Sequence, residues 1–332
     1  MSIELTTRCN LDCPHCLAEA SKEGKSIPYD RILSLVDEAQ LIGVRILDLG
    51  GGEPLLYDGF FDLCEYILSK GLKLSFVTNG LLIPTRINSL RRILKKYDDL
   101  LGVGVSLDGP SPELHGYFRP KETFDSAIEA IIMLRESGAK VSVSCVLNKE
   151  NIKVIPEFLS FLSALNISDV RFLPFMPLGR GAKFKSEVLS SRAIYDFLQQ
   201  KHSWNKIFKG NIGFQMPWEF LFLPPKKRQA GPCEAGYTRL WINSHGDVTP
   251  CAYMIDVIIG NIYHDSISKI WHDSFVLKKL RDPTLLKGPC ATCAYRDGCR
   301  GGCRGLAYFL EGDYLCSDPY CPIVVQGKET QA

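Results

Sequence analysis

The chain lacks the features that mark membrane-spanning, secreted and nucleic-acid-binding proteins. Its 332 residues contain no apolar run near the ~20 residues that a bilayer-spanning helix needs. Residues 1–8 lack the apolar core of a secretory signal. The 39 basic and 37 acidic residues leave a net charge of +2, without a strong block of either sign. We therefore expect neither a nucleic-acid partner nor a membrane partner.

Cysteine, by contrast, is abundant. The chain has thirteen cysteines. Because no secretory signal precedes them, disulfides are the weaker interpretation and metal or redox use is the stronger one. Such a surplus of thiols indicates metal clusters and predicts a cytoplasmic protein.

The pattern of apolar residues predicts an α/β fold over residues 1–205. A chain of this length exceeds what one core usually organises, so we expect a large domain and a smaller one. Short β-rich runs alternate with amphipathic runs, which is typical of βαβ units in a parallel sheet. The expected strands are 3–7, 44–49, 73–77, 102–107, 141–147 and 170–173, and the expected helices are 29–42, 60–69, 87–97, 123–137 and 154–165.

The composition changes twice after residue 205. Residues 206–232 are rich in glycine and proline and carry the basic run Lys226-Lys227-Arg228, so we interpret them as a connector. Residues 233–332 hold eight of the thirteen cysteines, at 233, 251, 290, 293, 299, 303, 316 and 321. That crowding predicts a small, loop-rich domain organised by metal clusters.

Three further cysteines, Cys9, Cys13 and Cys16, stand near the start of the chain with the spacing C-x3-C-x2-C. Three thiolates at this spacing can hold three irons of a four-iron cluster, which usually has four cysteine ligands. The fourth iron is then open to a small molecule. A fragment of a zinc knuckle, or idle thiols, is the alternative for the motif taken alone.

The motif resembles that of the radical SAM superfamily, in which an aromatic residue or histidine precedes the third cysteine, as His15 does here. The resemblance implies a partial (β/α)6 TIM-like barrel and a [4Fe–4S] cluster on Cys9, Cys13 and Cys16. S-adenosylmethionine (SAM) would bind the open iron, and reduction would cleave it to a 5′-deoxyadenosyl radical. Chemistry in such barrels gathers at the carboxyl ends of the strands.

The resemblance also implies a SAM pocket. Gly51-Gly52-Glu53-Pro54, after the second expected strand, matches the segment that holds the methionyl amino group. Asp108 fits either this pocket or a turn cap, and Arg119 fits either a SAM or substrate anchor or a solvated loop. The other expected pocket residues are Thr78, Ser106, Ser144 and Leu173, which follow or lie on the later strands.

The later cysteines follow the spacing Cys233-x12-Gly246-x4-Cys251, then Cys290-x2-Cys293-x5-Cys299-x3-Cys303, then Cys316. This pattern resembles the SPASM extension, which holds two auxiliary iron–sulfur clusters, expected to be [4Fe–4S]; a pair of zinc ribbons is the rival. The resemblance assigns Cys290, Cys293, Cys299 and Cys316 to an outer cluster, and Cys233, Cys251 and Cys303 to an inner one. Cys321 is either a fourth inner ligand or a free thiol.

One position departs from a known branch of that family. Anaerobic sulfatase maturases have an aspartate base where this chain has Ala252, which argues against that activity. The neighbouring Tyr253 is a candidate proton or electron donor, with a packing role as the alternative.

These residues predict a radical SAM/SPASM enzyme that abstracts hydrogen from a ribosomally made peptide or protein and thereby crosslinks, oxidises or epimerises it. A reductant such as ferredoxin or flavodoxin is implied. Because only eight residues precede Cys9, we expect a separate protein to bind any leader peptide. The alternatives are a tetrapyrrole side-chain enzyme of the haem or haem d1 pathway and, in another class, a non-enzymatic electron carrier or zinc scaffold.

Overall fold

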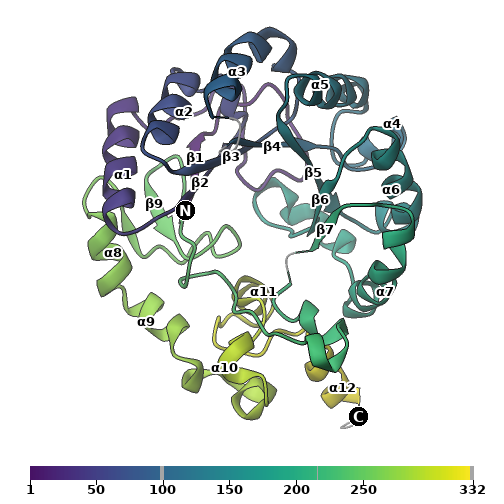
Figure 1. Ribbon diagram of the computed structural model, residues 1–332. Coiled ribbons are helices and arrows are strands. Elements are labelled where there is room, and N and C mark those ends of the chain that lie inside the picture. The colour runs from purple at the N-terminus through teal and green to yellow at the C-terminus, as the bar shows by residue number, and fades with distance from the viewer. Residues whose placement is uncertain (98–100, 215, 330–332) are drawn as a thin grey trace. The chain divides into compact units, whose positions relative to one another are not determined.

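The computed structural model describes residues 1–97, 101–214 and 216–329, and the chain forms two compact units (Figure 1). The first unit comprises residues 1–188, 204–213 and 242–246. The second comprises residues 189–203, 214–241 and 247–332. In the part of the chain that the structure describes, no helix is long and apolar enough to cross a bilayer.

The frame of the first unit is a sheet of six parallel strands. Each strand pairs with the strand that comes next in the sequence. The predicted strands are confirmed within a few residues, and β7 (Asn211–Phe214) follows β6 in the sheet, inside the segment interpreted as a connector. The six strands are β1 (Ser2–Thr6), β2 (Ile46–Gly51), β3 (Lys73–Thr78), β4 (Leu101–Ser106), β5 (Lys140–Leu147) and β6 (Asp169–Pro174).

Helices connect these strands and cover the outer side of the curved sheet (Figure 1). The apolar stripe of α1 shows why: Ile32, Leu35, Val36 and Ala39 recur at helical spacing and are all buried. The mixed α/β architecture with a parallel sheet is as predicted. The helices are α1 (Tyr29–Leu41), α2 (Phe60–Ser69), α3 (Ile83–Tyr97), α4 (Pro112–His115), α5 (Phe124–Glu136) and α6 (Ile155–Ala164).

Parallel pairing brings the carboxyl ends of these strands to one edge. Thr78 pairs with Val105, and Ser106 pairs with Ser144, so the motifs after β3 and β4 start at nearly the same level. The register between β1 and β2 shifts between Glu4 and Thr6, just before the cysteine motif. The segments rich in chemistry therefore meet at this edge, as expected for barrels of this kind.

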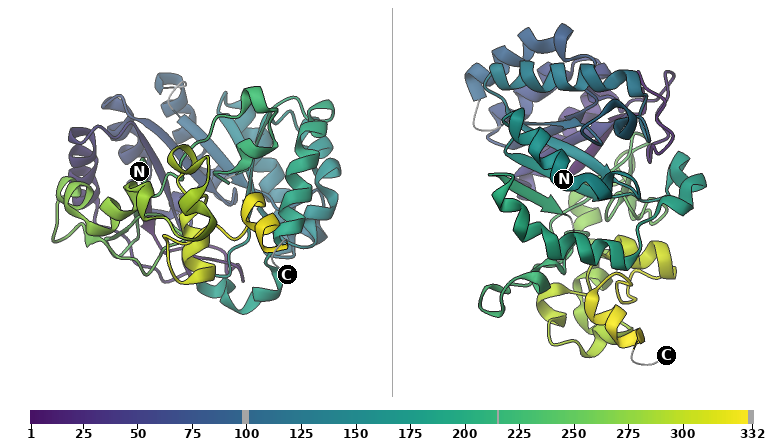
Figure 2. Two further views of the ribbon diagram at one scale, coloured as in Figure 1. Left: turned by 90° about the horizontal axis from the view of Figure 1, so that it is seen from below. Right: turned by 90° about the vertical axis from the view of Figure 1, so that its right-hand side faces the viewer.

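The second unit consists mainly of short helices and long loops, drawn from teal-green to yellow in Figure 2. Its two short strands β9 and β10 pair antiparallel, and β8 (Trp241–Ile242) lies where the chain passes between the units. The elements are α7 (Ser191–Lys201), β9 (Asp247–Thr249), β10 (Gly260–Asn261), α8 (Ile267–Asp273), α9 (Phe275–Arg281), α10 (Arg296–Cys299), α11 (Arg304–Glu311) and α12 (Pro322–Glu329).

Candidate functional site

The three amino-terminal cysteines lie in the loop that follows β1. Cys9, Cys13 and Cys16 are free thiols; Cys13 is buried and the other two are half-buried. The backbone N–H of Cys9 donates to the carbonyl of Ser21 at 2.7 Å, which closes the base of the loop. One short segment thus presents three unpaired thiols.

The environment of these thiols fits metal binding. Burial raises the pKa of Cys9 to about 11, and burial also raises the pKa of Cys13 against the opposing charge of Arg119. A buried thiol ionises readily only when a cation lies against the thiolate, and bound iron supplies that charge. The donor set therefore suits an iron–sulfur cluster with three protein ligands.

Within residues 1–97, 101–214 and 216–329, no three Cys, His, Asp or Glu side chains converge closely enough to hold a single metal ion. The zinc alternatives gain no support from this geometry, because zinc needs four ligands around one point. The thiols of a four-iron cluster bind different irons and need not converge.

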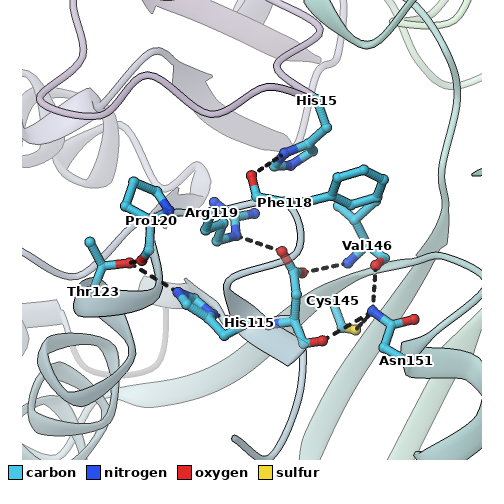
Figure 3. A network of polar contacts seen from close by, with 10 residues as sticks. His15, His115, Phe118, Arg119, Pro120, Thr123, Cys145, Val146 and Asn151 are labelled. Atoms are coloured by element: carbon cyan, nitrogen blue, oxygen red, sulfur yellow. Dashed lines mark hydrogen bonds and ion pairs between the residues drawn. The ribbon is translucent and has the colours of Figure 1, made fainter. Parts of the chain in front are cut away.

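His15 is fixed against the loop that precedes α5 (Figure 3). Its Nδ1 lies 2.8 Å from the carbonyl oxygen of Phe118, and the two rings stack with centroids 4.9 Å apart. Burial lowers the pKa of His15 to about 4, so the ring is neutral at neutral pH. Because a carbonyl only accepts, Nδ1 carries the proton and Nε2 is left as an acceptor.

Arg119 and Asp108 form a buried ion pair beside this histidine (Figure 3). Arg119 Nε donates to Asp108 Oδ2 at 2.7 Å, and the side chains are 12% and 0% exposed. The N–H of Val146 donates to Oδ1 of Asp108 at 2.8 Å. Burial alone would raise the pKa of Asp108, but the charge of Arg119, together with the nearby histidines and the hydrogen bond from Val146, outweighs burial and holds the pKa below its usual value. Arg119 is thus a buried charge and not a solvated loop residue, and it acts on Cys13 and Glu53.

Further hydrogen bonds surround Asp108. Its backbone N–H donates to His115 Nδ1 at 3.4 Å, and the Asn151 side-chain amide donates to its carbonyl at 3.0 Å. The same amide reaches Cys145 Sγ at 3.6 Å, so this buried thiol belongs to the packing of the network. The turn after β4 is therefore held in place from several sides.

Glu53, in the Gly-Gly-Glu-Pro segment after β2, is 1% exposed, and its carboxylate accepts three hydrogen bonds. Its Oε1 accepts from the Thr78 hydroxyl at 2.8 Å and from the N–H of Leu55 at 3.2 Å, and its Oε2 accepts from the N–H of Asn79 at 2.9 Å. Burial raises the pKa of Glu53 to about 7. A cationic ligand at this carboxylate would offset the cost of ionising it.

Glycine is required before Glu53 because the segment lies directly on the cysteine loop. Gly51 has a φ of +127°, and a Cβ there would lie 2.2 Å from the carbonyl oxygen of Thr6. A Cβ on Gly52 would lie 2.1 Å from the carbonyl oxygen of Arg8. Any side chain would separate Glu53 from the loop. Pro54 begins a short 3-10 turn capped by Glu53.

The remaining expected pocket residues lie on the four following strands. Thr78 contacts Glu53 directly, and Ser106 and Ser144 face each other as register partners, each 8% exposed. Leu173 pairs with Val146 one strand further on. Ser144 also lines a cavity of about 450 Å³ that extends along β3 to β6 toward their amino ends. These positions lie in the carboxyl-terminal halves of four neighbouring strands.

Two residues of this unit were not assigned roles by sequence reasoning. The Asn79 side-chain amide donates to Asn10 Oδ1 at 2.7 Å, which ties β3 to the cysteine motif. Arg180, after β6, contacts the same motif through its side chain. Asn79 directly follows Thr78, an expected pocket residue, whereas no local signal distinguishes Arg180 from a solvated arginine.

In the second unit, Cys233, Cys251 and Cys303 lie together. A thiol hydrogen bond from Cys303 lowers the pKa of Cys233, whereas burial, assisted by the charge of Cys233, raises the pKa of Cys251 to about 12. Tyr253 lies beside this group: a Cβ on Gly305 would be 2.7 Å from Tyr253 Cβ and 3.2 Å from Cys251 Sγ. Burial raises the pKa of Tyr253, so its phenol stays protonated.

A separate group of thiols surrounds a small cavity. Cys290, Cys293, Cys299 and Cys321 line it together with Gly301 and Gly302. Among residues 216–329, Cys316 lies outside the set that lines this cavity. The structure thus brings Cys321 to the three cysteines expected at the outer cluster, and Ser317, which directly follows Cys316, also contacts this group by accepting from the N–H of Cys290 at 2.9 Å.

Asp318 connects the two thiol groups. It is 0% exposed, and its Oδ2 accepts from the N–H of Cys303 at 2.8 Å and from Trp218 Nε1 at 2.7 Å. Its Oδ1 accepts from the N–H of Tyr320, next to Cys321, at 2.9 Å. Sequence reasoning did not single out Asp318, because an aspartate in a loop resembles an ordinary turn residue.

Comparison with known proteins agrees with this geometry. The sequence profile of the radical SAM superfamily matches residues 3–162, and that of the SPASM iron–sulfur cluster-binding domain matches residues 233–294. The AdoMet-dependent heme synthase of Methanosarcina barkeri is 30% identical, over 96% of this chain and 94% of that protein. The mycofactocin maturase MftC of Mycolicibacterium smegmatis is also 30% identical, over 96% of this chain and 81% of that protein.

A solved structure shows the same fold. SuiB of Streptococcus suis bound to S-adenosylmethionine superposes with a TM-score of 0.77 at 19% identity, covering 97% of this chain and 76% of SuiB. SuiB has also been solved with its precursor peptide SuiA. The chain therefore belongs to the radical SAM superfamily, as an enzyme that uses S-adenosylmethionine and iron–sulfur clusters and carries a SPASM domain.

Proposed function

We propose that this enzyme modifies a ribosomally made peptide by abstracting hydrogen from one of its carbon atoms. The observation that carries the proposal is a buried carboxylate, Glu53, which is oriented by three hydrogen bonds and packed through its backbone on the loop with three free thiols. When bound, the cluster and SAM supply the 5′-deoxyadenosyl radical. The residues of this chain bind and orient that cofactor and hold the reacting groups away from water.

Each end of the methionyl group has a matching charge. We assign its amino group to the Glu53 carboxylate and its carboxylate to Arg119, whose buried charge acts on Cys13 and Glu53. Gly51, Gly52 and Pro54 set the position of Glu53. The nucleoside is assigned to Thr78, Ser106, Ser144 and Leu173 on four neighbouring strands, together with His15 of the cysteine loop.

For the auxiliary clusters we assign one set of ligands to each thiol group. Cys290, Cys293, Cys299 and Cys321 are the outer ligands, because they share one cavity. Cys233, Cys251 and Cys303 are the inner ligands and leave one iron open for an external ligand. This assignment replaces Cys316 by Cys321 and leaves Cys316 as a thiol. Tyr253 is placed as a donor next to the inner cluster.

The relatives support two substrate classes. The name of the mycofactocin maturase and the complex of SuiB with a precursor peptide favour a peptide. The chain is as identical in sequence to a heme synthase as to the maturase, and the match covers a larger share of the heme synthase than of the maturase. This similarity favours a tetrapyrrole as the second candidate. Because Ala252 stands where sulfatase maturases have an aspartate base, we do not propose that activity for this enzyme.

The test is to incubate the reconstituted enzyme anaerobically with SAM and a reductant such as ferredoxin or flavodoxin. One arm contains a precursor peptide encoded beside its gene, and the other contains a carboxylated porphyrinoid. A mass change in the peptide alone supports the proposal, whereas conversion of the porphyrinoid alone replaces it by the second candidate.

We place the enzyme in the cytoplasm, since its thirteen cysteines are all free thiols.

A further inference from the structure

The segment after β6 lies directly on the amino-terminal cysteine loop. Gly179 has a φ of +54°, and a Cβ there would lie 2.4 Å from the carbonyl oxygen of Leu17 and 2.7 Å from that of Cys16. The backbone N–H of Arg180 donates to the Cys16 carbonyl at 3.1 Å. The two backbones are therefore in contact, although β2 to β6 separate them in the sequence.

The side chain of Arg180 spans this loop. Nε donates to the carbonyl of Cys13 at 3.1 Å, and Nη1 donates to the carbonyl of Ala20 at 2.6 Å. Nη1 also lies 3.0 Å from Asp12 Oδ1, a carboxylate that is 85% exposed. One guanidinium thus connects two carbonyls on either side of Cys16 through two separate nitrogens in a fixed plane, a geometry that the single nitrogen of a lysine does not reproduce.

One nitrogen of the Arg180 guanidinium makes no hydrogen bond within the described residues. Within the described residues, Nη2 is buried and has no hydrogen-bond partner. A buried donor of a charged group without a partner is costly, so a partner is expected in the loaded protein. The carbonyls that Arg180 contacts belong to the loop that carries the three thiols. The group that belongs beside these thiols is the iron–sulfur cluster.

We infer that Arg180 is a positioning residue for the amino-terminal cluster. Nε, Nη1 and the backbone N–H hold the cysteine loop in shape, and Nη2 donates a charge-assisted hydrogen bond to a sulfur of the bound cluster. A cation that donates to this sulfur favours the reduced cluster, because it stabilises the added negative charge. The inference concerns the cluster itself and does not depend on which substrate the enzyme modifies.

The test compares Arg180→Gln and Arg180→Lys with the wild-type full chain, reconstituted anaerobically. The readouts are iron content, the rate of iron loss to a chelator, and the reduction potential of the cluster whose electron paramagnetic resonance signal changes when SAM is added. None of these needs substrate, so a failure here is distinct from a failure of the proposed function. Arg92→Gln is the matched control, because Arg92 pairs with Glu65 on the surface with its side chain 63% exposed.

For Arg180→Gln we expect iron loss from this cluster to be faster by roughly tenfold or more, and its potential to be more negative. Arg180→Lys should keep the potential near that of the wild type but still lose iron faster, because it cannot bridge both carbonyls. The control should match the wild type. If the cluster of folded Arg180→Gln has the reduction potential of the wild type, the proposed hydrogen bond from Arg180 to the cluster is wrong. Wild-type iron loss in both Arg180 variants overturns the positioning role.

Discussion

The hydroxyl group of Thr78 donates a hydrogen bond to Glu53 at 2.8 Å, and both side chains are 1% exposed. This bond joins the segment after β2 to the end of β3, and the N–H of Asn79 occupies the second carboxylate oxygen. A carboxyl group so deeply buried ionises less easily, and its pKa is raised to about 7. Glu53 is thus held in one orientation while its charge depends on what binds beside it.

The affinity for SAM should therefore depend on pH. The neutral acid predominates below about pH 7 and the carboxylate above it. Because only the carboxylate pairs with an ammonium group, affinity should rise through pH 7 and be about tenfold weaker at pH 6 than at the plateau. Isothermal titration calorimetry between pH 6 and pH 8 measures this.

Glu53→Gln is the control for this prediction. It should bind SAM weakly at every pH, because the amide cannot ionise. An affinity of the wild type that is constant from pH 6 to pH 8, or a pH profile that survives in Glu53→Gln, would contradict the assigned role of Glu53.

Removing the partner of Arg119 should destabilise the first unit. In Asp108→Asn the buried guanidinium loses its counter-charge, for which we expect a loss of about 3–5 kcal/mol in the free energy of unfolding. Urea denaturation measures the change. Asp58→Asn breaks the pair with Arg8 at a side chain that is 95% exposed and should cost no more than about 1 kcal/mol. If Asp108→Asn lowered the free energy of unfolding as little as Asp58→Asn, the buried pair would not be structurally important.

The first unit was largely predictable because its signals are local. The alternation of strands and helices, and motifs such as Gly51-Gly52-Glu53-Pro54, depend on residues close in sequence, and parallel pairing then brings the motifs to one edge. The spacing of Cys9, Cys13 and Cys16 likewise reflects one loop. Such features are readable without tertiary contacts.

The contacts that escaped prediction join distant segments. Arg180 reaches Cys13 across 167 positions, and Asp318 reaches Trp218 across 100, so no local spacing reveals either pair. Cys316 and Cys321 are both a short distance after Cys303 in sequence. Only the path of the loop distinguishes them, because it turns Cys321 toward the cavity.

Iron analysis should distinguish Cys321 from Cys316. Three four-iron clusters predict about twelve irons per chain in the wild type. Cys321→Ala removes one side of the outer cavity and should lower the content toward about eight irons. Cys316→Ala should retain the wild-type content. The reverse result would return the outer ligand to Cys316.

A side chain at Gly305 should disturb the inner cluster. Its Cβ would lie 2.7 Å from Tyr253 Cβ and 3.2 Å from Cys251 Sγ, so Gly305→Ala must displace one of them. We expect loss of the inner cluster, measured as iron content and as its electron paramagnetic resonance signal. Gly231→Ala is the control, because a Cβ there meets nothing within 4 Å. An intact inner signal in Gly305→Ala would contradict the proposed ligands.

The central claim is that the amino-terminal thiols hold the cluster at which SAM is cleaved. The most direct measurement is the yield of 5′-deoxyadenosine from anaerobic protein, SAM and dithionite. The wild type and Cys64→Ala, which alters a buried thiol on α2 outside the thiol groups, should form it, whereas Cys13→Ala should form none. A yield from Cys13→Ala equal to that of the wild type would contradict the account.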